Sequence, residues 1–186
     1  MSAPQAEPQL ESGECNGIQF CGGQIVGCRD NQQDRYAVNV HLNGVLAAVA
    51  DGIGGIPNGD WAAEAAMDIV RTLHQVNPRP EHLLSAAMKM ADEKVRSFRN
   101  LDVIGPGTTL LLAWMKGNLL EFSSAGDSLI FLLRKSASEE KKIQFLNPRR
   151  LNQYNFIGTS SDGPRSRSMA VEPGDMVILA TDGLIG

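Results

Sequence analysis

The sequence predicts an α+β fold with mostly antiparallel strand pairing, organised around one hydrophobic core. Three observations support this prediction. Strand-like segments come first, two helical segments follow them, and strand-like segments then return. This grouping is typical of α+β proteins, because α/β proteins alternate single strands with single helices. A chain of 186 residues is long enough for one sizeable core and too short for two comfortable domains.

The early strands are marked by apolar and β-branched residues. They are predicted over residues 18–27, 36–42 and 44–51. The third, GVLAAVAD, is a short apolar run that ends at glycines, which is typical of a strand buried on both faces. Residues 1–16 lack a basic region followed by an apolar stretch, so they do not resemble a secretory signal. They are expected to form a disordered lead.

Two helices are predicted in the middle of the chain. Apolar residues recur with helical spacing over residues 60–76, where Asp60 is the expected N-cap and Pro78 lies just past the end. A second apolar stripe follows helical spacing over residues 81–98, with Pro80 near its start. Both helices therefore have one face suited to packing on a sheet.

The rest of the chain returns to strands. They are predicted over residues 108–115, 118–127, 128–134, 143–146 and 174–183. The sequence Lys116-Gly117-Asn118 is a plausible hairpin turn between the first two. Residues 147–170 are rich in turn-forming residues and irregular. A loop of this length inside a compact domain is uncommon and often functional.

Composition narrows the classes of partner and location. A net charge of −4 and a pI near 5.4 give a weak electrostatic case for nucleic acid or an anionic membrane. There is no apolar run of about 18 residues, so no membrane span is expected. Three cysteines, an odd number, favour reduced thiols and a cytoplasmic location. Their spacing fits no common zinc pattern.

Three aspartates share one context, since each follows an apolar strand directly into a turn. They are Asp51, Asp127 and Asp182. Any one alone has an ordinary alternative, because Asp-Gly is a standard turn pair. The sequence ADGIGG, however, puts three glycines after Asp51, and a bare glycine backbone lets its carbonyl approach a cation. Carboxylates without histidine or cysteine partners favour Mg²⁺ or Mn²⁺ over zinc.

A further pair of charged residues lies between two of the predicted strands. The segment VGCRDNQQDRYAV places Arg29 five residues before Asp34 in a polar turn. The planar guanidinium of arginine binds pairs of phosphate oxygens well. A surface ion pair is the alternative for an isolated arginine and aspartate. Beside a carboxylate metal site, the combination suggests hydrolysis of a phosphate ester.

Six short motifs together resemble one family. They are RDNQQD (29–34), ADGIGG (50–55), GTT (107–109), AGDS (125–128), EPGD (172–175) and ATDG (180–183). Their order and spacing, over about residues 23–186, are similar to metal-dependent protein phosphatases of type 2C, particularly bacterial members. The resemblance implies a central antiparallel β-sandwich flanked by helices on both outer faces, within a domain over residues 17–186. The family continues past ATDG, so the C-terminal elements are expected to be missing.

The resemblance also implies a metal site. Asp51 is implied to bridge two Mn²⁺ or Mg²⁺ ions, with the Gly52 carbonyl on one ion and Asp182 on the other. Asp127 and Asp182 correspond to the residues that hold a third, weaker ion in many bacterial members. Asp34 is implied to act through metal-bound water.

The implied reaction is hydrolysis of phosphoserine and phosphothreonine in proteins, with a cognate kinase as the opposing enzyme. Arg29, Asp34 and Asp51 are the implied catalytic residues, with Arg29 on the substrate phosphate. A hydroxide that bridges the metals attacks phosphorus without a covalent intermediate. Residues 147–170 correspond to a mobile flap beside the site.

The sequence departs from the family pattern in ways that leave an alternative open. Gln33 replaces a glutamate of many members, and Ile53 replaces a histidine of the eukaryotic ones. The family's later Asp-Asn motif does not occur before the chain ends at Gly186. The expectation is therefore a fragment or shortened form with reduced activity. The alternative is a pseudophosphatase, a regulatory binding module with an impaired metal site.

Overall fold

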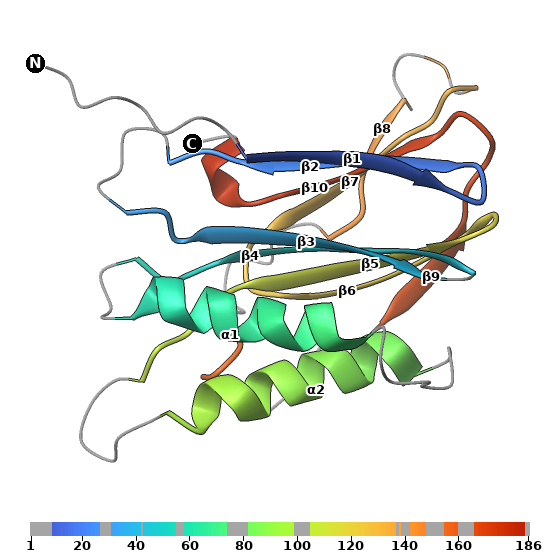
Figure 1. Ribbon diagram of the computed structural model, residues 1–186. Coiled ribbons are helices and arrows are strands. Elements are labelled where there is room, and N and C mark those ends of the chain that lie inside the picture. Colours follow the sequence, from blue (N-terminus) through green and yellow to red (C-terminus); the bar gives the residue numbers. More distant parts are fainter. Residues whose placement is uncertain are drawn as a thin grey trace, which may run out of the picture.

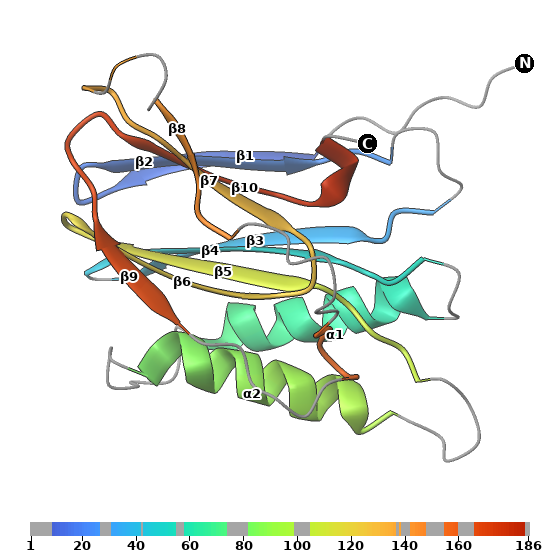
Figure 2. The same cartoon turned by 180° about the vertical axis from the view of Figure 1, so that it is seen from behind.

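A five-stranded sheet lies between a pair of helices and a second layer of strands in the computed structural model (Figure 1). The described residues are 9–26, 31–41, 43–54, 58–73, 82–98, 105–136, 138, 142–147, 155–159 and 166–184. Figure 2 shows the same three layers from behind. Both described helices cover the outer face of the five-stranded sheet, and the second strand layer covers its other face.

The central sheet is antiparallel throughout, and its strand order is β3-β4-β5-β6-β9. Its strands are β3 (Asp34–His41), β4 (Gly44–Asp51), β5 (Leu110–Lys116), β6 (Leu119–Ala125) and β9 (Arg167–Ala170). Three connections join strands that are neighbours in the sheet: β3 to β4, β4 to β5, and β5 to β6. The first and the third are hairpins, and both helices lie in the connection from β4 to β5. The turn between β5 and β6 contains Gly117 at φ +57°, as the Lys-Gly-Asn sequence predicted.

The second layer consists of two smaller pieces. One is a three-stranded sheet in the order β10-β7-β8, with β7 (Leu129–Leu133), β8 (Ile143–Phe145) and β10 (Met176–Ala180). The other is the hairpin of β1 (Gln9–Cys15) and β2 (Ile18–Gln24). In both views the hairpin lies on the same side of the central sheet as β7 and β10 (Figures 1 and 2).

The two helices are α1 (Gly59–Thr72) and α2 (Leu83–Arg96), and they pack on the sheet through mostly small or unbranched residues. The face of α1 that packs on the sheet is rich in alanine, so the helix axis can approach the strands closely. A first core cluster fills the space between helices and sheet, and includes Leu84 and Met88. Burial of such side chains is the main favourable contribution to folding.

Strand β5 contributes to two cores at once. Leu110 and Leu112 belong to the cluster beneath the helices, whereas Leu111 and Ala113 belong to the cluster between the sheets. Because alternate side chains of a strand point to opposite faces, a strand buried on both faces must be apolar at every position. This requirement explains the uninterrupted run LLLAW at the centre of the fold.

The predicted fold class is confirmed as α+β with antiparallel sheets, and both helices occur where the periodicity placed them. Three local expectations are wrong. The disordered lead does not extend over residues 9–16, because residues 9–15 form β1 through backbone pairing with β2. The N-cap of α1 is Asn58 in the left-handed region rather than Asp60, which lies in the first helical turn. Strand β9 lies within the segment 147–170, which was expected to be irregular.

No helix among the described residues has both the length and the apolar character needed to cross a bilayer.

A buried carboxylate fixes the turn that leads into β10. Asp175 has a side chain only 2% exposed and accepts hydrogen bonds from the backbone N–H groups of Glu172 (2.9 Å) and Lys135 (3.1 Å). The guanidinium of Arg134 donates a further bond at 2.7 Å. Burial by itself raises the pKa of Asp175, but these donors outweigh burial and leave the pKa below its ordinary value. The turn is therefore stabilised by the ionised form.

We predict that Asp175→Asn lowers the free energy of unfolding by about 1–3 kcal/mol at pH 7, because a charged acceptor is lost from a buried network. Urea unfolding measures the effect. Since the folded pKa lies below the unfolded value, the stabilisation is complete above about pH 5 and is lost as the pH falls below about 4. Glu172→Gln, which changes an exposed acid in the same turn, is the control. Equal stability of Asp175→Asn and the wild type would contradict the prediction.

A close backbone approach joins the end of β4 to the start of α1. A Cβ at Gly52 would overlap the carbonyl group of Gly59 and the backbone nitrogen of Asp60. We predict that Gly52→Ala lowers the free energy of unfolding by about 1–3 kcal/mol, because backbone atoms must move apart. Gly183→Ala is the matched control, since the nearest atom to its added Cβ lies 3.9 Å away. Thermal unfolding of both variants tests the difference.

Candidate active site

A pocket of about 150 Å³ lies at one edge of the two strand layers. Its lining residues are Asp51, Gly52, Ile53, Gly54, Thr109, Asp127, Phe156 and Asp182. Three of them are the aspartates that the sequence analysis singled out at strand ends. None of the described lining residues carries a positive charge. The pocket is therefore small and negatively charged.

The three aspartates meet because their strands end at the same place. Strands β4 and β6 both pair antiparallel with β5, so they run in the same direction and their carboxyl ends lie at one edge. Asp51 is the last residue of β4, and Asp127 follows β6 by two residues. Asp182 follows β10 of the other layer by two residues and begins a short 3₁₀ helix.

The backbone of Asp51 is held on both sides by threonines. The Asp51 N–H donates to Oγ1 of Thr109 at 2.8 Å, and the Thr109 N–H donates to the Asp51 carbonyl at 2.8 Å. Thr108 Oγ1 donates to the same carbonyl at 2.9 Å. Thr109 Oγ1 also shares a hydrogen bond with Ser128 Oγ at 2.7 Å, and both hydroxyls are almost fully buried. Asp51 therefore occupies a fixed position.

Asp51 is the pocket residue whose pKa is shifted by its neighbours. Its pKa is raised to about 7, first by burial and then by the negative charges of Asp34, Asp182 and Asp127. A hydrogen bond between the carboxyl groups of Asp51 and Asp182 adds to the rise. The pocket thus holds more negative charge than its own surroundings neutralise.

The residues fit a hard divalent cation in donor type and charge. Carboxylate and backbone carbonyl oxygens are the ligands that Mg²⁺ and Mn²⁺ prefer. Gly52 lines the pocket, and no group among the described residues donates a hydrogen bond to its carbonyl oxygen. The described residues nevertheless contain no group of three acidic, histidine or cysteine side chains already close enough to enclose an ion. The aspartates supply the charge and donors, and coordination requires them to draw together.

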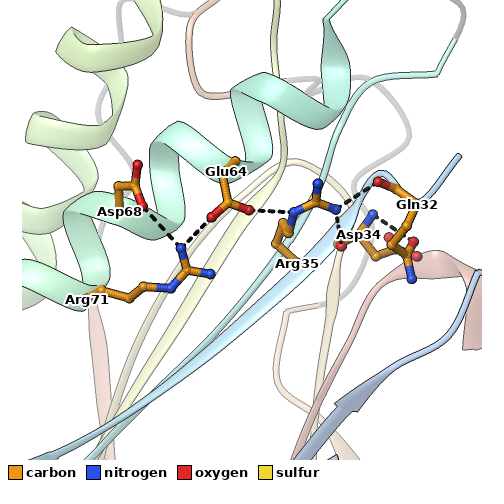
Figure 3. Close-up of polar contacts among 6 residues, drawn as sticks. All are labelled: Gln32, Asp34, Arg35, Glu64, Asp68 and Arg71. Atoms are coloured by element: carbon orange, nitrogen blue, oxygen red, sulfur yellow. Dashed lines mark hydrogen bonds and ion pairs between the residues drawn. The ribbon is translucent and has the colours of Figure 1, made fainter. Parts of the chain in front are cut away.

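Asp34 lies on the neighbouring strand, directly opposite Asp51 in the β3–β4 register. Two side chains hold its backbone (Figure 3). Gln32 Oε1 accepts a bond from the Asp34 N–H at 3.1 Å, and the Arg35 guanidinium donates to the carbonyls of Gln32 (2.7 Å) and Asp34 (2.9 Å). Arg35 is itself held by Glu64 of α1 at 2.6 Å. Helix α1 is thereby connected to the candidate site.

Arg29 lies outside the described residues, as do residues 148–154 and 160–165 of the expected flap. Within that segment, residues 155–159 are attached to the fold by three hydrogen bonds. Ile157 and Thr108 exchange backbone hydrogen bonds of 2.9 and 3.2 Å, and the Gly158 N–H donates to Asp92 of α2 at 2.7 Å. These contacts place Phe156 in the wall of the carboxylate pocket.

The site contains functional candidates that the sequence analysis did not identify. Thr109, Phe156 and Arg35 have no residue type or spacing that marks them individually. Thr109 belongs to the GTT motif, which resembles the family pattern but does not by itself mark a site residue. Arg35 follows Asp34 directly, and its partner Glu64 lies on a helix 29 residues further along the chain. Only the packing of α1 on β3 reveals that pairing.

Comparisons with known proteins agree with this geometry. The sequence profile of the family described as protein phosphatase 2C matches residues 27–186. No curated protein matches the chain. Several solved structures are similar in fold.

The catalytic domain of the serine/threonine protein phosphatase PstP, in complex with two manganese ions, has a TM-score of 0.68 and 22% identity over 96% of this chain and 78% of that one. RsbX in complex with magnesium has a TM-score of 0.69 and 16% identity, over 95% and 79% of the two chains. PppA, a regulatory component of T6SS in Pseudomonas aeruginosa, has a TM-score of 0.67 and 23% identity, over 97% and 79%. At these identities the likeness establishes the fold.

The profile match covers most of the chain and includes every residue of the carboxylate pocket. The family resemblance that the six motifs predicted is confirmed by it. The chain therefore belongs to the protein phosphatase 2C family, and its enzyme class is that of a protein serine/threonine phosphatase.

Proposed function

We propose that this chain hydrolyses phosphoserine and phosphothreonine in proteins by using Mn²⁺ or Mg²⁺ held in the carboxylate pocket. The observation that carries the proposal is the repulsion of Asp51 by Asp34, Asp127 and Asp182. A divalent cation relieves that repulsion and is often the largest charge in such a site. The presence of manganese in the PstP structure and of magnesium in the RsbX structure supports this choice of metals.

The family resemblance implies the roles of the aspartates, and their positions around one pocket support them. Asp51 lies at the centre of the acidic set, and the resemblance implies that it would be a ligand shared by two ions, with the carbonyl of Gly52 as a ligand of one of them. Asp182 would hold the other ion, and Asp127 beside it would contribute to a third, weaker position. Asp34 lies across the strand pair from Asp51, where its carboxylate would orient water. Bound cations of this kind lower the pKa of water and offset negative charge on phosphoryl oxygens.

Other residues of the chain position the aspartates and would hold the substrate phosphate. Thr108 and Thr109 fix the backbone of Asp51, and Arg35 fixes the backbone of Asp34, so the backbones of these two aspartates are positioned before substrate arrives. Arg29 would hold the substrate phosphate, as the family resemblance implies. No cysteine or serine nucleophile is required, because water is the attacking group. The proposed location is the cytoplasm, with a cognate kinase as the opposing enzyme.

We predict that Asp51→Asn lowers kcat/KM by at least about 100-fold toward both p-nitrophenyl phosphate and a phosphothreonine peptide, because the central ligand is lost. Phosphate release in the presence of Mn²⁺ measures the activity, and calorimetry measures Mn²⁺ binding. Glu93→Gln, an acid-to-amide change at a side chain 64% exposed on α2, is the matched control and keeps wild-type values.

Two outcomes would overturn the proposal in different ways. Unchanged hydrolysis by Asp51→Asn would show that the pocket is not the catalytic site. Tight Mn²⁺ binding by the wild-type chain, without hydrolysis of any phosphopeptide, would favour the pseudophosphatase alternative.

We also predict that Thr109→Val lowers both the free energy of unfolding, by about 1–3 kcal/mol, and kcat. The substitution keeps the shape of the side chain but leaves the Asp51 N–H and the Ser128 hydroxyl without a partner in a buried position. Chemical unfolding and steady-state kinetics check the two effects. Thr72→Val makes the same change at an exposed position of α1 and serves as control; an equal effect in both variants would refute the argument.

A further inference from the structure

A groove of about 630 Å³, separate from the carboxylate pocket, runs along the outer edge of β3. Its floor is formed by residues 35–39 of that strand, and Gln32 lines the end nearest the candidate site. Glu64 and Arg71 of α1 form one wall. Glu11 of β1 and Gln24 of β2 form the opposite wall.

The register of β3 shows which backbone groups face this groove. The Gly52 N–H donates to the carbonyl of Gln33, so Gln33 and Gly52 are a hydrogen-bonded pair of the antiparallel ladder. Such pairs alternate with pairs whose N–H and carbonyl groups point away from the partner strand. The N–H and carbonyl groups of Tyr36 and Val38 therefore point outward, away from β4.

The hydrogen bonds of Asp34 agree with this alternation. Its N–H and carbonyl also point outward, and both are bonded by side chains, namely Gln32 Oε1 and the Arg35 guanidinium. The strand edge is thus closed beside the candidate site and open further along. Strand β3 is the outermost strand of its sheet, and within the described parts of the chain no group bonds the backbone of Tyr36 or Val38.

The wall formed by α1 is charged, and its side chains are joined by ion pairs (Figure 3). Glu64 bonds Arg35 on one side and Arg71 on the other, and Arg71 also bonds Asp68 at 3.1 Å. The charges alternate along the wall, so neither sign dominates. The opposite wall is polar as well. A segment that enters the groove therefore needs polar side chains and a free backbone more than a hydrophobic anchor.

We propose that the open edge of β3 binds an extended segment of the phosphoprotein substrate as an added strand, on one side of the phosphorylated residue. This inference rests on the proposed function and names how that site recognises its substrate. An extended segment satisfies two N–H groups and two carbonyls, those of Tyr36 and Val38, which a folded surface does not reach.

The position of the edge suits this role. Tyr36 lies two residues along β3 from Asp34, which corresponds to about 7 Å. A substrate strand paired with Tyr36 and Val38 would thus begin a few residues from the phosphorylated residue. The five-residue floor of the groove sets the useful length of the segment at about five residues.

The first experiment uses phosphothreonine peptides extended by five residues of alternating serine and alanine, on either the N-terminal or the C-terminal side. Fluorescence anisotropy measures binding, and phosphate release in Mn²⁺ measures hydrolysis. Extension on one side is expected to tighten binding by about tenfold or more, and extension on the other side to leave it unchanged.

The second experiment tests the pairing itself. Each amide of the better peptide is N-methylated in turn, which removes one donor and leaves the protein intact. Methylation of alternate amides is expected to weaken binding by about threefold to tenfold, and methylation of the amides between them to have little effect. An effect without alternation would refute strand addition.

A protein variant gives an independent check. Val38→Pro removes the outward N–H without removing a bond of the β3–β4 ladder, a position where edge strands tolerate proline. It is expected to lose the preference for the extended over the short peptide, expressed as a ratio of dissociation constants. Val38→Thr keeps the N–H and is the matched control. Circular dichroism establishes that both variants are folded.

The outcomes separate this inference from the proposed function. If the short and long peptides are both hydrolysed and bind with equal affinity, strand addition in the groove is refuted, while the proposed phosphatase activity is supported. Alternating dependence on N-methylation without any hydrolysis would support the groove and refute the phosphatase.

Discussion

Repulsion among four carboxylates is the constraint on which the candidate site depends. The fold brings four aspartates from strands of both layers near one another, namely Asp34, Asp51, Asp127 and Asp182. None of the described residues that line the pocket has a positively charged side chain. Partial burial strengthens this repulsion, because water screens it less. The fold must therefore supply enough packing to keep the strand ends together. A divalent cation would remove the repulsion between the carboxylates, and this relief would favour its binding.

The packing that does this lies on both sides of β5. Its alternate side chains enter the core under the helices and the core between the sheets, so β4 and β6 are fixed on either side of it. The close approach of Gly52 to Gly59 then ties the end of β4 to α1. Thr109 connects the Asp51 backbone to the buried hydroxyl of Ser128. Each contact restricts a strand end that electrostatics alone would separate.

Helix α1 has a role beyond covering the sheet. Through Glu64 it holds Arg35, and Arg35 holds the backbone of Asp34. The same residues form one wall of the groove along β3. A single helix face thus helps to hold the backbone of a candidate catalytic residue and forms one wall of the groove along β3.

The sequence by itself determined the fold class, the two helices, most strands, and the aspartates at strand ends, because periodicity and turn residues are local properties. Local rules failed at β1, which exists through pairing with β2, and at the α1 N-cap, where Asn58 replaces the expected Asp60. Only the tertiary structure decided that Asp51, Asp127 and Asp182 share one pocket, that Thr109 and Phe156 line it, and that Arg35 holds the backbone of Asp34. It also decided that β3 forms the edge of its sheet, since these relations join residues far apart in the chain and follow from sheet order and register.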